Sequence, residues 1–327
     1  MSILEVRDLN VSYASSAGPI PAVRGVSFEV DRGEVLGLAG ESGCGKSTIA
    51  ASILRLLPKD ATTKGEVLLD GEDVLTMGWG RLRAVRWSKA SIIFQGAMHG
   101  LNPVKRVGDQ IAQAILLHDP DATKASATKQ AAGLLEQVKM PARRIRAYPH
   151  ELSGGQKQRV MIAMALACGP ELIIADEPTT ALDVMVQAQI LDLLKGLQRD
   201  LGLATLFITH DLSVLTEVAD RIAVMYAGRI VEIGPADQVF GDPHHPYTRA
   251  LGSAFPEIGD WSYRMSPVGL DGDPPHPNDI PSGCSFHPRC PVATDICAET
   301  EPQLITRGVD RSSACLLLES NATSQLS

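Results

Sequence analysis

Residues 34–48 read Glu34-Val-Leu-Gly-Leu-Ala39 and then Gly40-Glu-Ser-Gly-Cys-Gly-Lys-Ser-Thr48. The first six residues form a nearly continuous apolar run, which is typical of a strand buried on both faces of a parallel sheet. The next nine fit the pattern G-x-x-x-x-G-K-[ST], in which glycines let backbone N–H groups face an anion at a helix N-terminus. Strand, turn and helix together predict a phosphate-binding loop.

Two side chains of this loop have expected roles in binding a nucleotide. Lys46 would supply a full positive charge for the β- and γ-phosphates, and Ser47 would supply a hydroxyl for Mg²⁺. A chance glycine-rich turn is the alternative, but the strand before the loop and the helix after it argue against that. The residues expected to contact ATP are therefore Gly40, Glu41, Ser42, Gly43, Cys44, Gly45, Lys46, Ser47 and Thr48.

A second apolar run, Leu172–Ala175, ends in two acids, Asp176 and Glu177. Ligands of open α/β sheets bind at the carboxyl ends of the strands, so both acids could face the phosphates. We expect Asp176 to hold Mg²⁺ through its water shell and Glu177 to polarise the attacking water. The alternative is a solvated acidic turn, which becomes a weaker interpretation beside a phosphate loop.

The organisation of the chain predicts an α/β fold. Strands alternate with helices along a mostly parallel sheet, and the alternating apolar residues of the first 30 positions predict strands with one buried face. The fold class that we expect assigns these strands to an additional antiparallel β subdomain. Helical patterns at Val107–His118 and Ala122–Lys139 predict a helical subdomain inserted at about 96–158. We expect an ATPase domain at 1–240 and a C-terminal extension at 241–327, where nine of the 21 prolines fall between Pro256 and Pro302.

Bulk properties exclude several function classes. A net charge of −8 over 327 residues repels polyanions, so nucleic acid is not an expected partner. The N-terminus has early acids and no apolar segment of a signal peptide, and no apolar run reaches the roughly 18 residues of a membrane helix. We therefore expect the chain to stay in the cytosol and to need another protein to cross any membrane at which it works.

Four of the six cysteines fall in the last 44 residues and predict a metal site. Their spacings of five, six and 17 intervening residues are wide for zinc and favour a [4Fe–4S] cluster. A structural Zn²⁺ and free thiols are the alternatives, and His287 is a further candidate ligand. The expected cluster ligands are Cys284, Cys290, Cys297 and Cys315.

A third glycine motif lies about a hundred residues after the phosphate loop and just before the acidic strand. It comprises Leu152, Ser153, Gly154, Gly155 and Gln156, and we expect a helix to start near Lys157. With this motif the chain resembles the ATP-binding subunits of ABC transporters. The resemblance implies a head-to-tail dimer in which the motif of one subunit closes on the ATP held by the other.

The same resemblance assigns roles to isolated residues. It implies that Tyr13 stacks on adenine, that Gln95 contacts Mg²⁺ and senses the γ-phosphate, that Asp183 belongs to the D-loop, and that His210 holds the γ-phosphate. With Glu177, Gln95 and His210 form the expected catalytic set, and Ser47, Gln95 and Asp176 the expected Mg²⁺ ligands. Taken singly, each could be an ordinary strand-edge, loop or capping residue, but their order and spacing favour the functional interpretation.

The tail narrows the resemblance to one branch. His245-Pro-Tyr-Thr-Arg-Ala-Leu251 and Gly283–Pro291 are similar to elements of oligopeptide and dipeptide importers, a branch that includes some nickel importers. The resemblance implies an energy-coupling ATPase on the cytosolic face of the membrane. It implies a homologous ATPase partner in a heterodimer, two permeases and an extracytoplasmic solute-binding protein, and it also favours the iron–sulfur cluster. One departure is Gly96-Ala97 after Gln95, where related chains often carry Asp-Pro.

Two other function classes remain as alternatives. A soluble ATPase of this superfamily in translation or DNA repair would usually carry two ATPase cores or a long coiled coil, and this chain has neither. A regulatory module with a vestigial ATP site is disfavoured because Glu177 and His210 are both present. A peptide importer subunit is the leading hypothesis, and an importer of nickel or another small solute is the nearest alternative.

Overall fold

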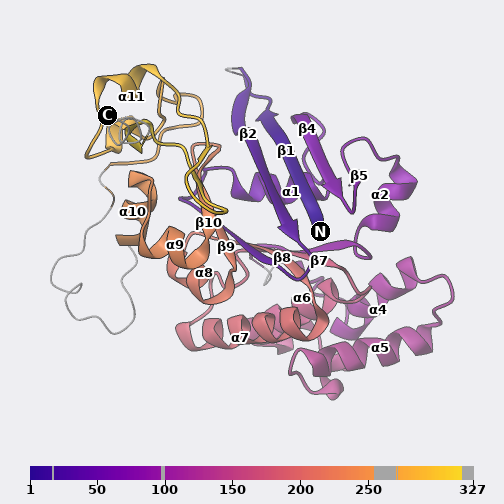
Figure 1. Ribbon diagram of the computed structural model, residues 1–327. Helices are drawn as coiled ribbons and strands as arrows, with labels where there is room; N and C mark the ends of the chain where they lie inside the picture. The colour runs from indigo at the N-terminus through magenta and orange to yellow at the C-terminus, as the bar shows by residue number, and fades with distance from the viewer. Residues whose placement is uncertain (17, 97–99, 254–269, 271, 319–327) are drawn as a thin grey trace.

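The computed structural model describes residues 1–16, 18–96, 100–253, 270 and 272–318 (Figure 1). The departure noted after Gln95 therefore lies partly outside the described residues, at positions 97–99. Two sheets and a helical region make up the molecule, and the predicted α/β class is confirmed. None of the described helices combines the length and the apolar character that crossing a membrane requires.

The larger sheet supplies the strand ends that carry the candidate site. Its inner strands β9, β3, β8, β7 and β6 pair in parallel, and β10, β12 and β11 continue the sheet as antiparallel strands. Every residue of β3 and β7 is buried, as the apolar runs predicted. In sheet order the strands are β11 (Ile305–Thr306), β12 (Ser312–Ser313), β10 (Arg229–Pro235), β9 (Arg221–Tyr226), β3 (Val35–Ala39), β8 (Ala204–Thr209), β7 (Leu172–Asp176) and β6 (Ala90–Ile93).

The smaller sheet is antiparallel, with strand order β2 (Ile20–Asp31), β1 (Ser2–Tyr13), β4 (Thr62–Leu69) and β5 (Glu72–Asp73). The pairing register of β1 shifts between Val6 and Leu9, and Asp8 there has φ 44. This bulge changes the spacing of the buried residues, because an extra residue turns the following side chains to the other face. The strict alternation expected along β1 is therefore interrupted at Asp8.

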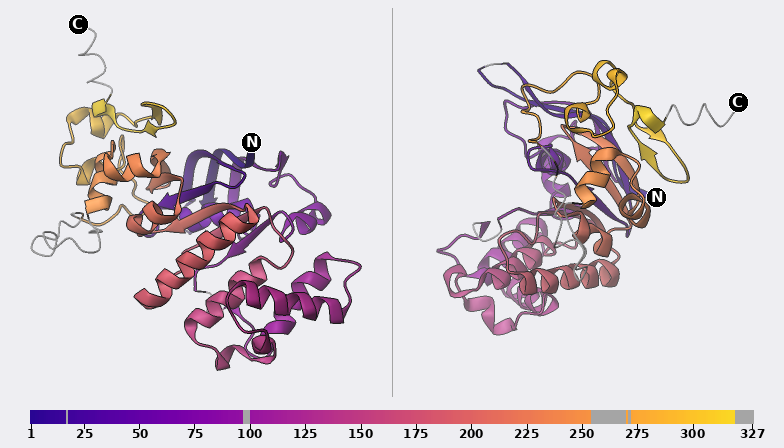
Figure 2. Two further views of the ribbon diagram at one scale, coloured as in Figure 1. Left: turned by 60° about the horizontal axis from the view of Figure 1, so that its bottom comes forward. Right: turned by 90° about the vertical axis from the view of Figure 1, so that its left-hand side faces the viewer.

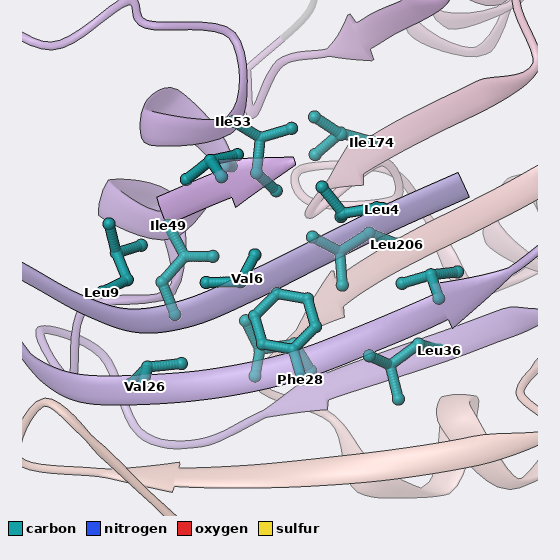
Figure 3. Close-up of a cluster of buried hydrophobic side chains, with 14 of the residues drawn as sticks. Leu4, Val6, Leu9, Val26, Phe28, Leu36, Ile49, Ile53, Ile174 and Leu206 are labelled. Atoms are coloured by element: carbon teal, nitrogen blue, oxygen red, sulfur yellow. The ribbon is translucent and has the colours of Figure 1, made fainter. Parts of the chain in front are cut away.

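The core between the two sheets is closed by the helix that follows the phosphate loop. Ile49 and Ile53 of α1 (Lys46–Ile53) are fully buried. Figure 3 shows them beside Phe28 of the smaller sheet and Leu36 and Leu206 of the larger one. Packing of α1 against both sheets fixes the direction of its N-terminus, and so fixes the loop that precedes it.

The helical region lies at one end of the molecule, away from the C-terminal segment (Figures 1 and 2). Its helix α4 matches the predicted bounds, and α5 is shorter by two residues at each end than the pattern suggested. α2 (Trp79–Val85) joins the smaller sheet to β6. The other elements of this region are α4 (Val107–His118), α5 (Lys124–Gln137), η1 (Ala142–Arg146), η2 (Pro149–Glu151) and α6 (Gly154–Ala165).

Further helices pack on the remaining face of the larger sheet around a separate apolar cluster that includes Phe207, Tyr226 and Tyr247. The C-terminal extension begins within this layer and ends by pairing β12 with β10, so it shares the sheet of the core. The helices of this layer are α7 (Val184–Leu201), α8 (Leu212–Val218), α9 (Ala236–Gly241) and α10 (Pro246–Ser253). The extension also contains η4 (His287–Arg289) and α11 (Asp295–Glu299).

Candidate nucleotide-binding site

The shape of the phosphate loop depends on two glycines, at positions where a side chain would be strained and would clash with the backbone of neighbouring strands. Gly40 has φ 150 and Gly45 has φ 107, both in the region that residues with a side chain rarely adopt. A Cβ on Gly40 would lie 2.2 Å from the Met225 carbonyl oxygen, and a Cβ on Gly45 would lie 2.3 Å from that of Ala22. The loop is therefore wedged between β9 and β2, and its backbone shape follows from both glycine positions.

Lys46 begins α1 and is only 6% exposed. Its Nζ donates to the carbonyl oxygens of Gly40, at 2.6 Å, and Glu41, at 2.9 Å. A buried ammonium needs nearby acceptors, and two loop carbonyls meet this need here. The loop thus concentrates positive charge at the N-terminus of α1, where an anion is also favoured by the helix dipole.

Ser47 and Asp176 lie together although 129 residues separate them in sequence. The Ser47 hydroxyl donates to Asp176 Oδ1 at 3.2 Å, and Asp176 is 5% exposed at the end of β7. Burial raises the pKa of the Asp176 carboxyl. A hydroxyl and a carboxylate oxygen at one spot are the hard ligands that Mg²⁺ prefers, so these residues fit the expected ion.

Glu177 is the meeting point of three side chains. Its Oε2 accepts hydrogen bonds from Gln95 Nε2 at 2.7 Å and from the Thr180 hydroxyl at 2.8 Å, and its Oε1 lies 3.3 Å from His210 Nδ1. Gln95 follows β6, Glu177 follows β7 and His210 follows β8, so three adjacent parallel strands deliver these groups to one edge. Glu177 therefore contacts both of the other expected catalytic residues, Gln95 and His210.

Tyr13 lies beside α1, whereas the glycine motif packs against another helix, α7. The Tyr13 hydroxyl lies 3.1 Å from Thr48 Oγ1, which brings the end of β1 to α1. A Cβ on Gly155 would meet Val186 Cγ1 at 2.6 Å, so the motif packs against the start of α7. Asp183 caps α7, because its side chain accepts from the Val186 N–H at 3.0 Å.

The helix at the glycine motif starts at Gly154, three residues before the predicted Lys157. Ser153 and Gln156 form a capping box: the Ser153 hydroxyl accepts from the Gln156 N–H, and Gln156 Oε1 accepts from the Ser153 N–H. The prediction placed both glycines before the helix, whereas the structure includes them in its first turn, although glycine is a poor helix former. The reciprocal cap stabilises the first turn despite them.

The predicted metal site in the extension is wrong. Among the described residues, no group of three or more His, Cys, Asp or Glu side chains is placed to hold a metal ion. Burial raises the pKa of Cys284 to about 11, and it also raises the pKa of Cys290 and Cys315, so these three side chains are neutral thiols in this structure. The cluster expected on Cys284, Cys290, Cys297 and Cys315 is therefore withdrawn, and all four are free cysteines.

Three residues that contact the candidate site were not predicted from the sequence. Thr180 donates to Glu177, and its position three residues later is the one signal that could have indicated it. Tyr247 and Arg289 reach the phosphate loop from the extension, and both contact Glu41. Their segments resemble the importer branch, but nothing local in the sequence pairs residues more than 200 positions apart.

This geometry defines a class: an α/β protein that binds a nucleoside triphosphate on a glycine-rich loop, with paired acids at the next strand end. Comparison with known protein families supports this class. Residues 23–180 match the family model described as ABC transporter, and residues 231–297 match the one described as oligopeptide/dipeptide transporter, C-terminal region. The first match contains the phosphate loop, the glycine motif and both acids.

Individual proteins extend the likeness over the whole chain. The dipeptide transport ATP-binding protein DppD of Bacillus subtilis is 42% identical, with 98% of this chain and 96% of the relative covered. The oligopeptide transport ATP-binding protein OppD of Mycobacterium bovis is 45% identical over 97% of this chain, which spans 52% of that relative's length. A solved dimeric bacterial ABC transporter cassette, 29% identical, superposes with a TM-score of 0.65 over 71% of this chain and 98% of the cassette.

The chain therefore belongs to the ABC transporter family of ATP-binding proteins, in its oligopeptide/dipeptide transporter branch.

Proposed function

We propose that this protein is the ATP-hydrolysing, energy-coupling subunit of an ABC importer for di- or oligopeptides. The observation that carries the proposal is the convergence on Glu177 of Gln95, Thr180 and His210, beside the Ser47–Asp176 pair. The match of residues 231–297 to the oligopeptide/dipeptide transporter region supports the choice of solute class. A relative named for dipeptide transport, alike over nearly its whole length, supports it further.

In the proposed chemistry, the phosphate loop binds the nucleotide, and residues at the ends of β6, β7 and β8 carry out hydrolysis. Lys46 and the loop N–H groups would bind the phosphates, and Ser47, Asp176 and Gln95 would hold Mg²⁺, which supplies charge neutralisation at the phosphates. Glu177 would accept a proton from the attacking water, with Thr180 and Gln95 fixing the carboxylate in place. His210, whose side chain is 54% exposed, is free to turn toward the γ-phosphate.

A second ATPase subunit would complete the site. We propose that Ser153, Gly154, Gly155 and Gln156 bind the ATP held by a homologous partner, with Asp183 at the same interface. Beside Asp183, the side chains of Val184 and Met185 are each 72% exposed, and apolar groups at such a position gain stability when a partner covers them. Two head-to-tail subunits would then enclose two ATP molecules.

The permeases would dock beside the helical region. A cavity of about 810 Å³ lies among α2, α4 and α6, and its lining combines the basic Arg83 and Lys105 with the apolar Trp87, Leu117 and Met164. Such a groove fits a short cytoplasmic helix that carries an acidic residue on one face. We propose two permeases, an extracytoplasmic solute-binding protein, and a peripheral position for this subunit on the cytoplasmic face of the membrane.

Two substitutions test the assignment of ATP hydrolysis. Glu177→Gln keeps the shape of the side chain but removes the base, so we expect turnover to fall about 100-fold or more with ATP binding retained. Lys46→Ala removes the charge that faces the phosphates, so we expect loss of nucleotide affinity. Titration with a fluorescent ATP analogue and a phosphate-release assay separate the two effects. Ordinary hydrolysis by the Glu177→Gln variant would overturn the proposed role.

A further inference from the structure

The C-terminal extension holds the phosphate loop through a two-pronged ion pair. Arg289 donates from its two terminal nitrogens to the Glu41 carboxylate, at 2.7 Å and 3.0 Å. The Arg289 side chain is 7% exposed and that of Glu41 is 22% exposed, so solvent screens this pair only weakly. Paired N–H donors on one carboxylate also fix its orientation, which a single contact does not.

The backbone of the same loop residue is held by a second residue of the extension. The Glu41 N–H donates to the Tyr247 hydroxyl at 2.9 Å, and Tyr247 is fully buried. The Glu41 carbonyl oxygen, in turn, accepts from Lys46 Nζ at 2.9 Å. Side chain, N–H and carbonyl of Glu41 are thus all engaged, and two of the three contacts come from outside the nucleotide-binding fold.

A rigid aromatic cluster supports both contacts. Tyr226, at the end of β9, packs against Tyr247 with ring centroids 4.6 Å apart and against Phe286 at 5.3 Å. The Arg289 guanidinium lies 5.9 Å from the centre of the Tyr226 ring and donates to its hydroxyl at 3.4 Å. Buried aromatic contacts of this kind hold side chains in one arrangement, so the extension presents fixed groups to the loop.

The ion pair between Glu41 and Arg289 affects nucleotide binding, because Glu41 is negatively charged. Glu41 lies inside the loop that receives the phosphates, and an unpaired carboxylate there would repel a polyphosphate across a short distance. The two-pronged pairing with Arg289 neutralises that charge and turns the Glu41 side chain toward the extension. The hydrogen-bonded Glu41 carboxylate raises the pKa of Arg289 further above its already high value, and an arginine guanidinium is charged at every physiological pH.

We propose that Tyr247 and Arg289 are positioning residues for ATP: they hold Glu41 so that the phosphate loop keeps its binding shape and loses the repulsion of its own carboxylate. The inference rests on the proposed function, since it concerns affinity for the same ATP. It gives the extension a part in nucleotide binding that neither family match assigns to it.

The test compares ATP dissociation constants of purified full-length variants. Arg289→Gln exposes the Glu41 charge, so we expect the dissociation constant to rise about tenfold, while Arg289→Lys, which keeps one charge, recovers part of the loss. Tyr247→Phe leaves the Glu41 N–H without its acceptor, and we expect a rise of about threefold. The double variant Glu41→Gln with Arg289→Gln should bind better than Arg289→Gln alone, because no charge remains to repel the phosphates.

Arg24→Gln is the matched control. Arg24 also joins core to extension, through Glu301 at 2.6 Å and Ser285 at 3.2 Å, and its side chain also donates to the Ala227 carbonyl at 3.3 Å. Within the described part of the chain, none of these bonds reaches the phosphate loop. We expect its dissociation constant to stay within about twofold of the parent, because the loop keeps all its contacts. Circular dichroism establishes that each variant is folded.

The outcomes separate this inference from the proposed function. If the parent protein fails to bind ATP, the proposed function falls. If the parent binds and Arg289→Gln binds equally well, the inference is overturned and the proposed function stands. Equal losses in Arg24→Gln and Arg289→Gln, or no recovery in the double variant, would also overturn it, because the effect would then come from a loosened extension.

Discussion

At the scale of single residues, the site depends on how one carboxylate is held. Glu177 adopts φ 47, a left-handed conformation that costs a residue with a side chain about 1–2 kcal/mol. Its N–H donates to the Ile208 carbonyl at 2.9 Å, which ties the turn to β8 and offsets the strain. The strained backbone directs the Glu177 carboxylate toward Gln95, Thr180 and His210. The conformation of Glu177 therefore places its side chain but does not stabilise the fold.

Thr180→Val tests how much this support contributes. The substitution keeps the shape but removes the hydroxyl that donates to Glu177 Oε2 at 2.8 Å. A hydrogen bond to a charged group contributes about 1.5 kcal/mol or more, so we expect turnover to fall about tenfold with unchanged ATP affinity. The measurement is steady-state phosphate release alongside equilibrium ATP titration.

Thr216→Val supplies the control for this change. Its hydroxyl donates only within α8, to the Ser213 carbonyl at 2.7 Å, so turnover should be that of the parent. A Thr180→Val protein that hydrolyses ATP at the parental rate would show that Glu177 is placed without help from Thr180.

Much of the site could be predicted from sequence, because the loop, the acids and the glycine motif are each local patterns. Asp176 and Glu177 end a strand that its apolar run makes plain, and strand ends of a parallel sheet meet at one edge. Tyr247 and Arg289 could not be assigned to the site in the same way, because a contact across more than 200 residues depends on how the extension folds back. The cysteine prediction failed because spacing does not determine where side chains point.

At the scale of secondary structure, apolar pattern predicted where elements lie, and local hydrogen bonds decided where they begin and end. The period of buried residues places α4 at its predicted bounds, and the apolar run Leu172–Ala175 forms β7 with one further residue, Asp176. The start of α6 was missed because a capping box, not hydrophobicity, determines it. β11 and β12 were missed because two-residue strands have no period to detect: β12 forms by pairing with β10, and β11 forms by pairing with β12.

Two glycines of the helical region should respond oppositely to alanine. A Cβ on Gly133, in α5, would meet no atom within 4 Å, whereas one on Gly108, in α4, would lie 2.1 Å from Ile145 Cγ1. Gly133→Ala should therefore raise the free energy of unfolding by about 0.5–1 kcal/mol, through lower backbone entropy of the unfolded chain. Gly108→Ala should lower it by about 1–3 kcal/mol, because Ile145 must move.

Urea unfolding followed by circular dichroism measures both changes, and each variant is the control for the other. Equal shifts in the same direction would contradict the packing argument. They would mean that helix propensity alone, and not the approach of η1 to α4, governs the response of this region.

At the scale of the whole molecule, the extension is joined to the core by buried polar contacts as well as apolar ones. Glu232 of β10 is fully buried, and it accepts from the backbone N–H groups of His244 and His245, each at 2.9 Å. Arg311, beside β12, donates to the same carboxylate at 2.8 Å. A buried charge needs this full set of partners, so the beginning and end of the extension must be in place together.

His245 makes this junction sensitive to acid. It is fully buried, its Nδ1 accepts from the Tyr247 N–H at 3.0 Å, and burial lowers its pKa from 6.5 to about 4. The unfolded chain takes up the proton near pH 6.5 and the folded chain only near pH 4, so the contribution of His245 to stability is complete above pH 6.5 and falls as pH drops from 6.5 toward 4.

Between pH 7 and pH 5 we expect this histidine to reduce the free energy of unfolding by about 2 kcal/mol. His245→Asn keeps an oxygen at the position of Nδ1 that can accept from the Tyr247 N–H but cannot titrate, so urea unfolding of this variant at both pH values should lack that part of the decrease. An equal decrease in both proteins would place the acid sensitivity elsewhere in the chain.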